Sequence, residues 1–210
     1  MLTTIPLRDA LRPIKLDEVI GHDRIKPTIK KYIEQERTRW LFHGPTGTGK
    51  TSLAHIVAHG LHAEEIRDIN GADFRVSDVR ELVEQIECYP MSGTHRIIIL
   101  DEAQALTSEV KSLLLKPLED RRQVNVWILC TMDVKNLHPA LRDRCESFKL
   151  NGMGENEKGQ LVSRAAEYLK YTGNTDQFLR GIKRMTSARE ILDAFEQVAN
   201  GTPVDIVLGE

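Results

Sequence analysis

Hydrophobic residues along this chain gather first in short runs that have no helical period. The strongest runs cover residues 38–44 (TRWLFHG), 95–104 (HRIIILDEAQ) and 125–133 (NVWILCTMD). Aliphatic and aromatic runs of this length are typical of strands that are covered on both faces. Weaker strands are expected at residues 64–71 and 148–150.

Amphipathic segments with helical spacing separate these predicted strands. They cover residues 49–63, 77–89 and 107–120. Ser77 is a candidate N-cap of the second segment, and the third opens on a threonine and a serine. Strands that alternate with helices predict an α/β fold with a parallel sheet and helices on both faces.

The strand-like runs cease near Asn151–Gly152, and helical patterns follow. Three helices are expected at residues 157–171, 175–185 and 187–199, where Thr186 and Ser187 supply a cap for the last one. We therefore predict an α/β domain at residues 1–151 and a small three-helix domain at residues 152–210.

Composition narrows the class of protein. The 210 residues are 40% hydrophobic and 29% charged, which is typical of a soluble globular protein. No apolar run approaches the length of a membrane span, and the N-terminus has no secretion signal. The cysteines Cys88, Cys130 and Cys145 are odd in number and form no CxxC pair, which fits a reducing cytoplasm. The net charge of −2 means that any contact with nucleic acid needs a local basic patch.

The segment GPTGTGKT at residues 44–51 matches the phosphate-loop pattern GxxxxGK[ST] between a predicted strand and a predicted helix. Its glycines let backbone N–H groups point at phosphate oxygens. Lys50 would reach the terminal phosphates of ATP, and the Thr51 hydroxyl would bind Mg²⁺. The alternative is a chance glycine turn. The candidate nucleotide-binding residues here are Gly44, Pro45, Thr46, Gly47, Thr48, Gly49, Lys50, Thr51 and Ser52.

Two acids follow the four aliphatic residues 97–100 of the run HRIIILDEAQ. Asp101 is the candidate that holds the metal ion, and Glu102 is the candidate that polarises a water for attack on the γ-phosphate. The alternative interpretation is an acidic pair that faces solvent. The mouth of a buried strand favours the functional interpretation, because ligands bind at that end of such sheets.

The order of these features resembles that of the AAA+ ATPases, and most closely the clamp-loader subunits that open sliding clamps for DNA polymerases. Four segments carry the resemblance: LRPIKLDEVIGHDRI (11–25), INGADFRVSDVRELVE (69–84), DEAQALTSEVKSLLLKPLED (101–120) and LHPALRDRCESFKL (137–150). It implies a P-loop ATPase domain followed by a helical lid. It also implies that Arg12, Ile20 and Gly21 pack around the adenine.

By the same resemblance, Arg144 is an arginine finger that reaches the ATP of a neighbouring subunit. A planar guanidinium can brace the charge on a transferring phosphoryl group. Arg142 either assists or pairs with an acid of its own domain. Asp143 stands where the family has serine, and it either orients the finger or holds it back. Cys145 is interpreted as a packing residue.

Two sensor positions are also implied by the resemblance. A polar residue is expected at the end of the 125–133 strand, where Thr131 is our candidate, although an ungapped count from Arg144 selects Met132. A slip of one residue on a strand exchanges its two faces. Arg189, in the first turn of the last helix, matches the second sensor arginine; an ordinary exposed arginine is the alternative.

The resemblance further implies partners. Arg75 and Arg80 correspond to the region that clamp loaders set against the DNA backbone, although Arg80 could instead bond Asp73 or Asp78. The expected partners are other AAA+ subunits in a homo- or hetero-oligomer such as a pentamer, a sliding clamp and primer–template DNA, with no membrane. The resemblance would place a collar domain after residue 210, so a truncated chain, a natural short form and a protein that assembles through its ATPase faces alone are all open.

Three functions remain open at this point. The first is an ATP-hydrolysing clamp-loader subunit of DNA replication. The second is a Holliday-junction or fork-remodelling motor, which the LRP…LDEVIG start and LRDR also resemble. The third is a nucleotide-gated switch that binds ATP and hydrolyses it poorly, for which Met132 and the missing collar argue.

Overall fold

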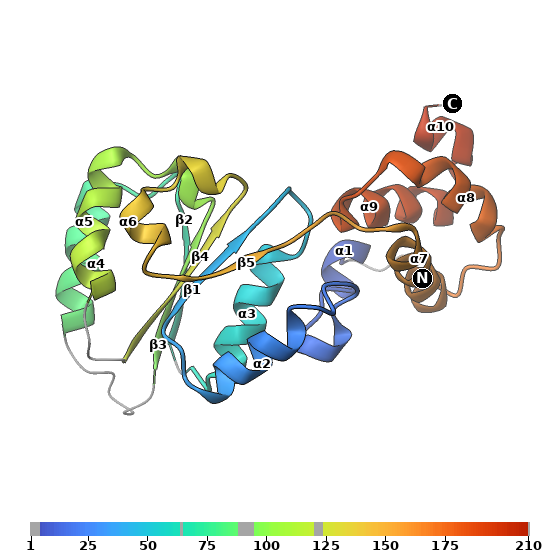
Figure 1. Ribbon diagram of the computed structural model, residues 1–210. Helices are drawn as coiled ribbons and strands as arrows, with labels where there is room; N and C mark the ends of the chain where they lie inside the picture. Colours follow the sequence, from blue (N-terminus) through green and yellow to red (C-terminus); the bar gives the residue numbers. More distant parts are fainter. Residues whose placement is uncertain (1–4, 64, 88–94, 120–123, 210) are drawn as a thin grey trace. The chain divides into compact units, whose positions relative to one another are not determined.

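The computed structural model describes residues 5–63, 65–87, 95–119 and 124–209. The chain divides into two compact units, one of residues 23–44 and 50–150 and the other of residues 1–22, 45–49 and 151–210. We call them the sheet unit and the helical unit. Figure 1 shows their elements in sequence colours. No described helix is long and apolar enough to cross a membrane.

The sheet unit contains five parallel strands in the order β2-β3-β4-β1-β5. Their bounds are β1 Arg39–His43, β2 Glu65–Asn70, β3 Arg96–Asp101, β4 Asn125–Thr131 and β5 Glu146–Lys149. The predicted α/β fold with a parallel sheet is confirmed. Because β3, β4 and β1 are neighbours, the residues that follow them meet at one edge of the sheet.

Helices cover both faces of this sheet, with α2 and α3 on one face and α4 and α5 on the other (Figure 1). The bounds are α2 Lys26–Glu34, α3 Lys50–Gly60, α4 Val76–Glu87, α5 Ser108–Glu119 and α6 Pro139–Arg142, with 3-10 turns η2 Ala103–Ala105 and η3 Val134–Asn136. The double cover explains why the strands β3 and β4 are almost continuously apolar and buried.

One local prediction in the sheet unit needs correction. Ser77 is not an N-cap, because α4 begins one residue earlier, at Val76. The Asp78 carboxylate instead accepts a hydrogen bond from the backbone N–H of Arg75 at 2.7 Å. The strand within residues 95–104 ends at Asp101, where the acids were expected to leave it. Glu102 adopts the left-handed conformation with φ 51°, and a 3-10 turn follows.

The helical unit joins both ends of the chain in one core. Its elements are α1 Leu7–Ala10, η1 Leu16–Glu18, α7 Glu155–Leu169, α8 Thr175–Gly181, η4 Ile182–Arg184, α9 Ala188–Ala199 and α10 Val204–Leu208. Leu7 and Leu11 are buried in the same cluster as Phe178 and Phe195. The backbone N–H of Leu7 donates to Glu196 Oε2 at 3.2 Å.

The three predicted helices of this unit are present, but the one expected at residues 175–185 is α8 followed by the turn η4. The Ser187 hydroxyl caps α9 by accepting from the N–H of Glu190. Residues 1–22 and 45–49 group with the helices and not with the sheet. The functional boundary near Asn151–Gly152 stays a prediction.

Candidate nucleotide site

The predicted phosphate loop connects the end of β1 to the start of α3. Its middle residue Gly47 has φ +68°, and a Cβ there would overlap Ser187 Oγ. The Gly47 carbonyl accepts a hydrogen bond from the N–H of Ala188 at 3.0 Å. Only glycine combines this backbone conformation with so close an approach to the start of α9.

Lys50 and Thr51 open α3 at the carboxyl edge of the sheet. Lys50 is only 6% exposed, and its Nζ donates to the Gly44 carbonyl at 2.9 Å. The Thr51 hydroxyl donates to Asp101 Oδ2 at 2.6 Å. A hydroxyl and a carboxylate so close together are hard oxygen ligands of the kind that Mg²⁺ prefers. Thr51 and Asp101 therefore fit the metal role expected of them.

Asp101 and Glu102 are held by the backbone around them. Asp101 Oδ1 accepts from the N–H of Glu102 at 2.9 Å, and the Asp101 carbonyl accepts from the N–H of Gly71 at 2.7 Å. A Cβ at Gly71 would lie 2.6 Å from the Glu102 carbonyl oxygen. Gly71, which the sequence analysis did not select, thus makes room for the left-handed turn at Glu102.

Gln104 is a second residue that the sequence analysis missed. Its Nε2 donates to Glu102 Oε2. Its Oε1 accepts from the Thr131 hydroxyl at 2.8 Å and from the N–H of Met132 at 3.1 Å. Thr131 is fully buried, whereas 46% of Met132 is exposed. Of the two sensor candidates, Thr131 is therefore the one whose side chain is linked to Glu102 through Gln104.

His43 is the last residue of β1 and directly precedes the phosphate loop. Burial, and secondarily Lys149, lower the pKa of His43 below its usual 6.5. His43 is therefore neutral at pH 7.

Of the other residues expected to contact the nucleotide, Ser52 lies in α3 of the sheet unit, whereas Arg12, Ile20, Gly21 and Arg189 lie in the helical unit. His22 Nε2 is 3.1 Å from the Thr48 carbonyl oxygen, so the segment that contains Ile20 and Gly21 adjoins the phosphate loop. Gly21 has φ +79° and packs against Glu157. Arg12 is exposed, and so is Arg189, which directly follows the residue that bonds Gly47. Their contacts with a nucleotide stay predictions.

The two arginines of the 141–146 segment have different acidic partners. Arg142 Nε pairs with Asp143 at 3.2 Å, so Arg142 has an acid of its own unit. Arg144 donates to the Ala140 carbonyl at 2.6 Å and forms an ion pair with Glu119. The Arg144 side chain is 32% exposed. The segment is accordingly at the surface, and a second molecule can approach this arginine.

Arg75 and Arg80 are both exposed at the start of α4. Within the described part of the chain, Arg80 forms no ion pair with Asp73 or Asp78; Asp78 is bonded to the backbone of Arg75 and to the Ser77 hydroxyl. The alternative role for Arg80, in which it would shape this loop by bonding Asp73 or Asp78, is therefore not supported by the structure.

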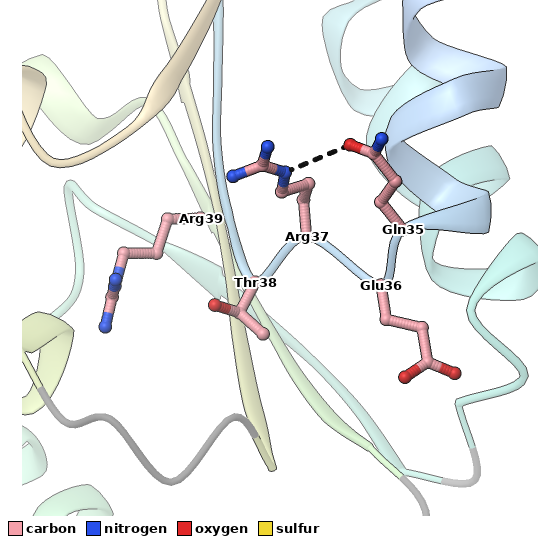
Figure 2. A pocket seen from close by; sticks show the side chains of 5 residues that line it. All are labelled: Gln35, Glu36, Arg37, Thr38 and Arg39. Atoms are coloured by element: carbon pink, nitrogen blue, oxygen red, sulfur yellow. Dashed lines mark hydrogen bonds between the residues drawn. The ribbon is translucent and has the colours of Figure 1, made fainter.

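A cavity of about 350 Å³ lies at the other end of β1, lined by Gln35, Glu36, Arg37, Thr38 and Arg39 (Figure 2). The phosphate loop follows the carboxyl end of this five-residue strand, which rises about 16 Å over its length. Arg37 in this cavity bonds Gln35 at 3.4 Å and pairs with Glu146 at 3.6 Å. We therefore separate the cavity from the candidate nucleotide site. No cluster of three or more metal-binding side chains occurs among the residues that the structure describes.

Comparison with known families gives one match over the sheet. Residues 40–152 match the model of the ATPase family associated with various cellular activities (AAA). That segment contains the phosphate loop, both acids and Arg144.

Curated relatives are replication factor C subunits. The chain is 28% identical to replication factor C subunit 3 of Blastobotrys adeninivorans over 97% of its own length, and 34% identical to the replication factor C small subunit of Natronomonas pharaonis over 69%. It spans 66% of the first relative and 46% of the second, so it covers about half to two thirds of their lengths.

Among solved structures, a similar one is the RuvB Holliday junction branch migration motor of Thermotoga maritima. The TM-score is 0.79 at 25% identity, with 95% of this chain and 71% of that chain covered. A second structure, of a variant of that protein, gives a TM-score of 0.78 at 24% identity, with the same shares of the two chains covered. This similarity supports the arrangement of the fold described above.

Proposed function

Because this chain belongs to the ATPase family associated with various cellular activities (AAA), we propose that it is an ATP-hydrolysing subunit of clamp-loader type that works in an oligomer. The observation that carries the proposal is the bonded set Thr51–Asp101–Glu102 at the sheet edge beside Lys50. The replication factor C relatives favour the clamp-loader task over other tasks of the family.

In the proposed mechanism the phosphate loop holds the phosphates of ATP with its backbone N–H groups and with Lys50. Thr51 and Asp101 would hold Mg²⁺, which would supply neutralisation of the negative charge on the phosphates. Glu102 takes a proton from the attacking water, and Thr131 helps to position that water. Arg189 is the proposed second sensor arginine.

Arg144 acts in trans in this proposal. Its guanidinium would leave Glu119 and Ala140 and brace the γ-phosphate of ATP in a neighbouring subunit, which makes hydrolysis depend on assembly. Partial exposure of the side chain supports this role. Arginine fingers of this kind contribute roughly 10³–10⁵-fold to turnover.

Subunit mixing tests the shared site. Glu102→Gln subunits keep their finger but lose the base, and Arg144→Ala subunits keep the base but lose the finger. We expect each to be inactive alone and turnover to return when they are mixed. An Arg144→Ala protein that hydrolyses ATP at the wild-type rate would remove the finger from the proposal. Arg142→Ala is the matched control, because Arg142 lies two residues away and pairs with Asp143.

DNA and a ring-shaped clamp are the proposed substrates of the assembly. Arg75 and Arg80 would contact phosphates without reading sequence, so binding to primer–template DNA should weaken steeply with salt. Replacing either arginine by alanine should lower the slope of log K against log salt by about one. A slope equal to that of the wild type would exclude a phosphate contact at that position.

A branch-migration motor is the second candidate, favoured by the structural similarity to the Thermotoga maritima protein. Stimulation of the ATPase distinguishes the two. A clamp-loader subunit responds to primer–template DNA with a clamp, whereas a branch-migration motor responds to a four-way junction. Negligible turnover with every DNA would instead favour the nucleotide-gated switch.

A further inference from the structure

Gln104 joins the polar ends of two neighbouring strands through one side-chain amide. Its Nε2 donates to Glu102, just after β3, and its Oε1 accepts from Thr131 and Met132 at the end of β4. The accepted bonds are 2.8 and 3.1 Å long. Every residue of this network lies in the sheet unit. The amide is therefore a direct link between the candidate base and the candidate sensor.

The orientation of the amide follows from its partners. The backbone N–H of Met132 can only donate, so the oxygen of Gln104 must face it. The nitrogen must then face the carboxylate of Glu102, which can only accept when ionised. Glutamine suits this position because one planar group supplies an N–H donor and an oxygen with two lone pairs. Glutamate would lack the donor, and lysine would lack the acceptor.

The backbone around Gln104 is anchored as well. Lys111 Nζ donates to the Gln104 carbonyl at 3.2 Å and to the Asn136 carbonyl at 2.9 Å. The left-handed turn at Glu102 directs residues 103–105 back toward the end of β4. The position of the amide is thus set by the turn and by an ammonium group, as well as by its own bonds.

We propose that Gln104 is a positioning residue for hydrolysis, an inference that rests on the proposed function of Glu102. It holds one oxygen of the Glu102 carboxylate by an N–H donor, and the other oxygen is left to take the proton from water. It also fixes the hydroxyl of Thr131, whose single hydrogen lies within reach of Gln104 Oε1 and of the Asp133 carbonyl at 3.0 Å. Base and sensor are then oriented together.

Turnover gives the first test. Gln104→Leu should lower kcat by roughly 10- to 100-fold, because misplacement of a catalytic group by about 1 Å has that cost. The Kd for ATP and the melting temperature should stay at wild-type values. Gln104→Glu keeps both accepted bonds but sets a second carboxylate beside Glu102, and it should lose kcat as well. The exposed Gln160 on α7 supplies the control Gln160→Leu, with kcat unchanged.

Coupling to Thr131 separates positioning from a general structural role. Thr131→Ser keeps the hydroxyl and should retain most of the turnover, whereas Thr131→Val should lose it. The double variant Gln104→Leu/Thr131→Val should be no slower than the slower single variant, because the two residues act through one network. Wild-type kcat in Gln104→Leu, or full additivity in the double variant, would overturn the proposal.

A spectroscopic test does not need turnover. The side-chain N–H₂ signals of Gln104, identified by their loss in Gln104→Leu, should be shifted and protected from exchange in the wild-type protein. Glu102→Ala should move them and speed their exchange. If they stay unchanged, the link to Glu102 does not exist. Failure of the proposed function looks different, since it would be absence of hydrolysis in the wild type while these signals still respond to Glu102→Ala.

Discussion

Gly71 lies so close to Asp101 and Glu102 that a single methyl group there would clash with their backbone. A Cβ there would lie 2.6 Å from the Glu102 carbonyl oxygen and 3.1 Å from that of Asp101. Gly71→Ala should therefore push the Asp101–Glu102 backbone away. We expect a loss of stability of about 1–3 kcal/mol and a fall in ATP turnover of roughly tenfold or more, measured by urea unfolding and by steady-state hydrolysis.

Gly159 supplies the matched control for this substitution. It lies inside α7, and a Cβ there would meet nothing within 4 Å. Gly159→Ala should stabilise the helix by about 0.5–1 kcal/mol and leave turnover unchanged. If Gly71→Ala and Gly159→Ala change stability and turnover in the same way, the close approach at Gly71 does not determine either quantity.

The burial of Cys145 predicts that its thiol reacts slowly. Burial, as the main cause, raises the pKa of its thiol to about 12, and burial also raises the pKa of Cys130. At pH 8 a thiol with that pKa is ionised in only about one molecule in ten thousand. In a Cys88→Ser background, neither thiol should react with a disulfide reagent at pH 8 until denaturant is added. Rapid labelling of the folded protein would contradict this; Cys88 itself lies outside the described residues.

Individual site residues were predictable where phosphate and metal binding require a recognisable motif. Lys50, Thr51, Asp101 and Glu102 follow from motif and strand context, and the structure brings Thr51 and Asp101 within bonding distance. Gln104 could not be found this way, because its role depends on the left-handed turn at Glu102, which no period in the sequence indicates.

Arg96, a buried arginine at the amino end of β3, bonds both β2 and α4. This contact gives a prediction of how stability depends on pH. Arg96 Nε bonds Glu65 at 2.7 Å, and its Nη1 bonds the Gln85 carbonyl at 3.1 Å. The bond from Arg96, and secondarily that from Arg67, holds the pKa of Glu65 below its usual 4.5.

A lowered pKa in the folded state stabilises the fold above the unfolded value and loses that effect as pH falls through the folded value. Glu65→Gln should therefore lower the free energy of unfolding at pH 7. The difference from wild type should shrink below about pH 4.5. Urea unfolding across pH measures it, with exposed Glu84→Gln on α4 as the control. A difference that stays constant with pH would exclude the ion pair as its cause.

Strands and helices were easiest to predict where their apolar residues form a clear pattern against polar neighbours. The strands β1, β3 and β4 carry aliphatic runs and are close to their predicted positions. β5 begins at Glu146, two residues before its prediction at 148–150, because its polar first residues hide it. The helices α1, α2, α6 and α10 were not predicted: α2 buries only Ile29, and the other three have four or five residues.

At the scale of the molecule, the helical unit depends on the first residues of the chain. Leu7 is completely buried beside α9, and Arg8 pairs with Asp193 at 3.1 Å. Leu7→Ala should cost about 2–5 kcal/mol of stability. Ile14 is 68% exposed, so Ile14→Ala should change little. Calorimetry measures both, and equal melting temperatures for the two variants would contradict this account of the core.

The α/β fold was predictable as a whole because the order of strands and helices specifies it, and the match to the AAA family agrees. Which residues make up the helical unit was not predictable. Residues 1–22 and 45–49 join it through contacts far apart in the chain, such as that of Leu7 with Glu196. A single sequence gives no sign of such pairings.

The packing of α1 against α9 has a consequence during synthesis. The ribosome makes Leu7 well before the residues of α7, α8 and α9 that bury it. At bacterial and eukaryotic elongation rates the delay is roughly ten to forty seconds. Throughout that interval the nascent segment around Leu7 displays leucines without the residues that pack against them in the folded unit. Chaperones that recognise short apolar stretches should therefore meet this segment before any other part of the helical unit.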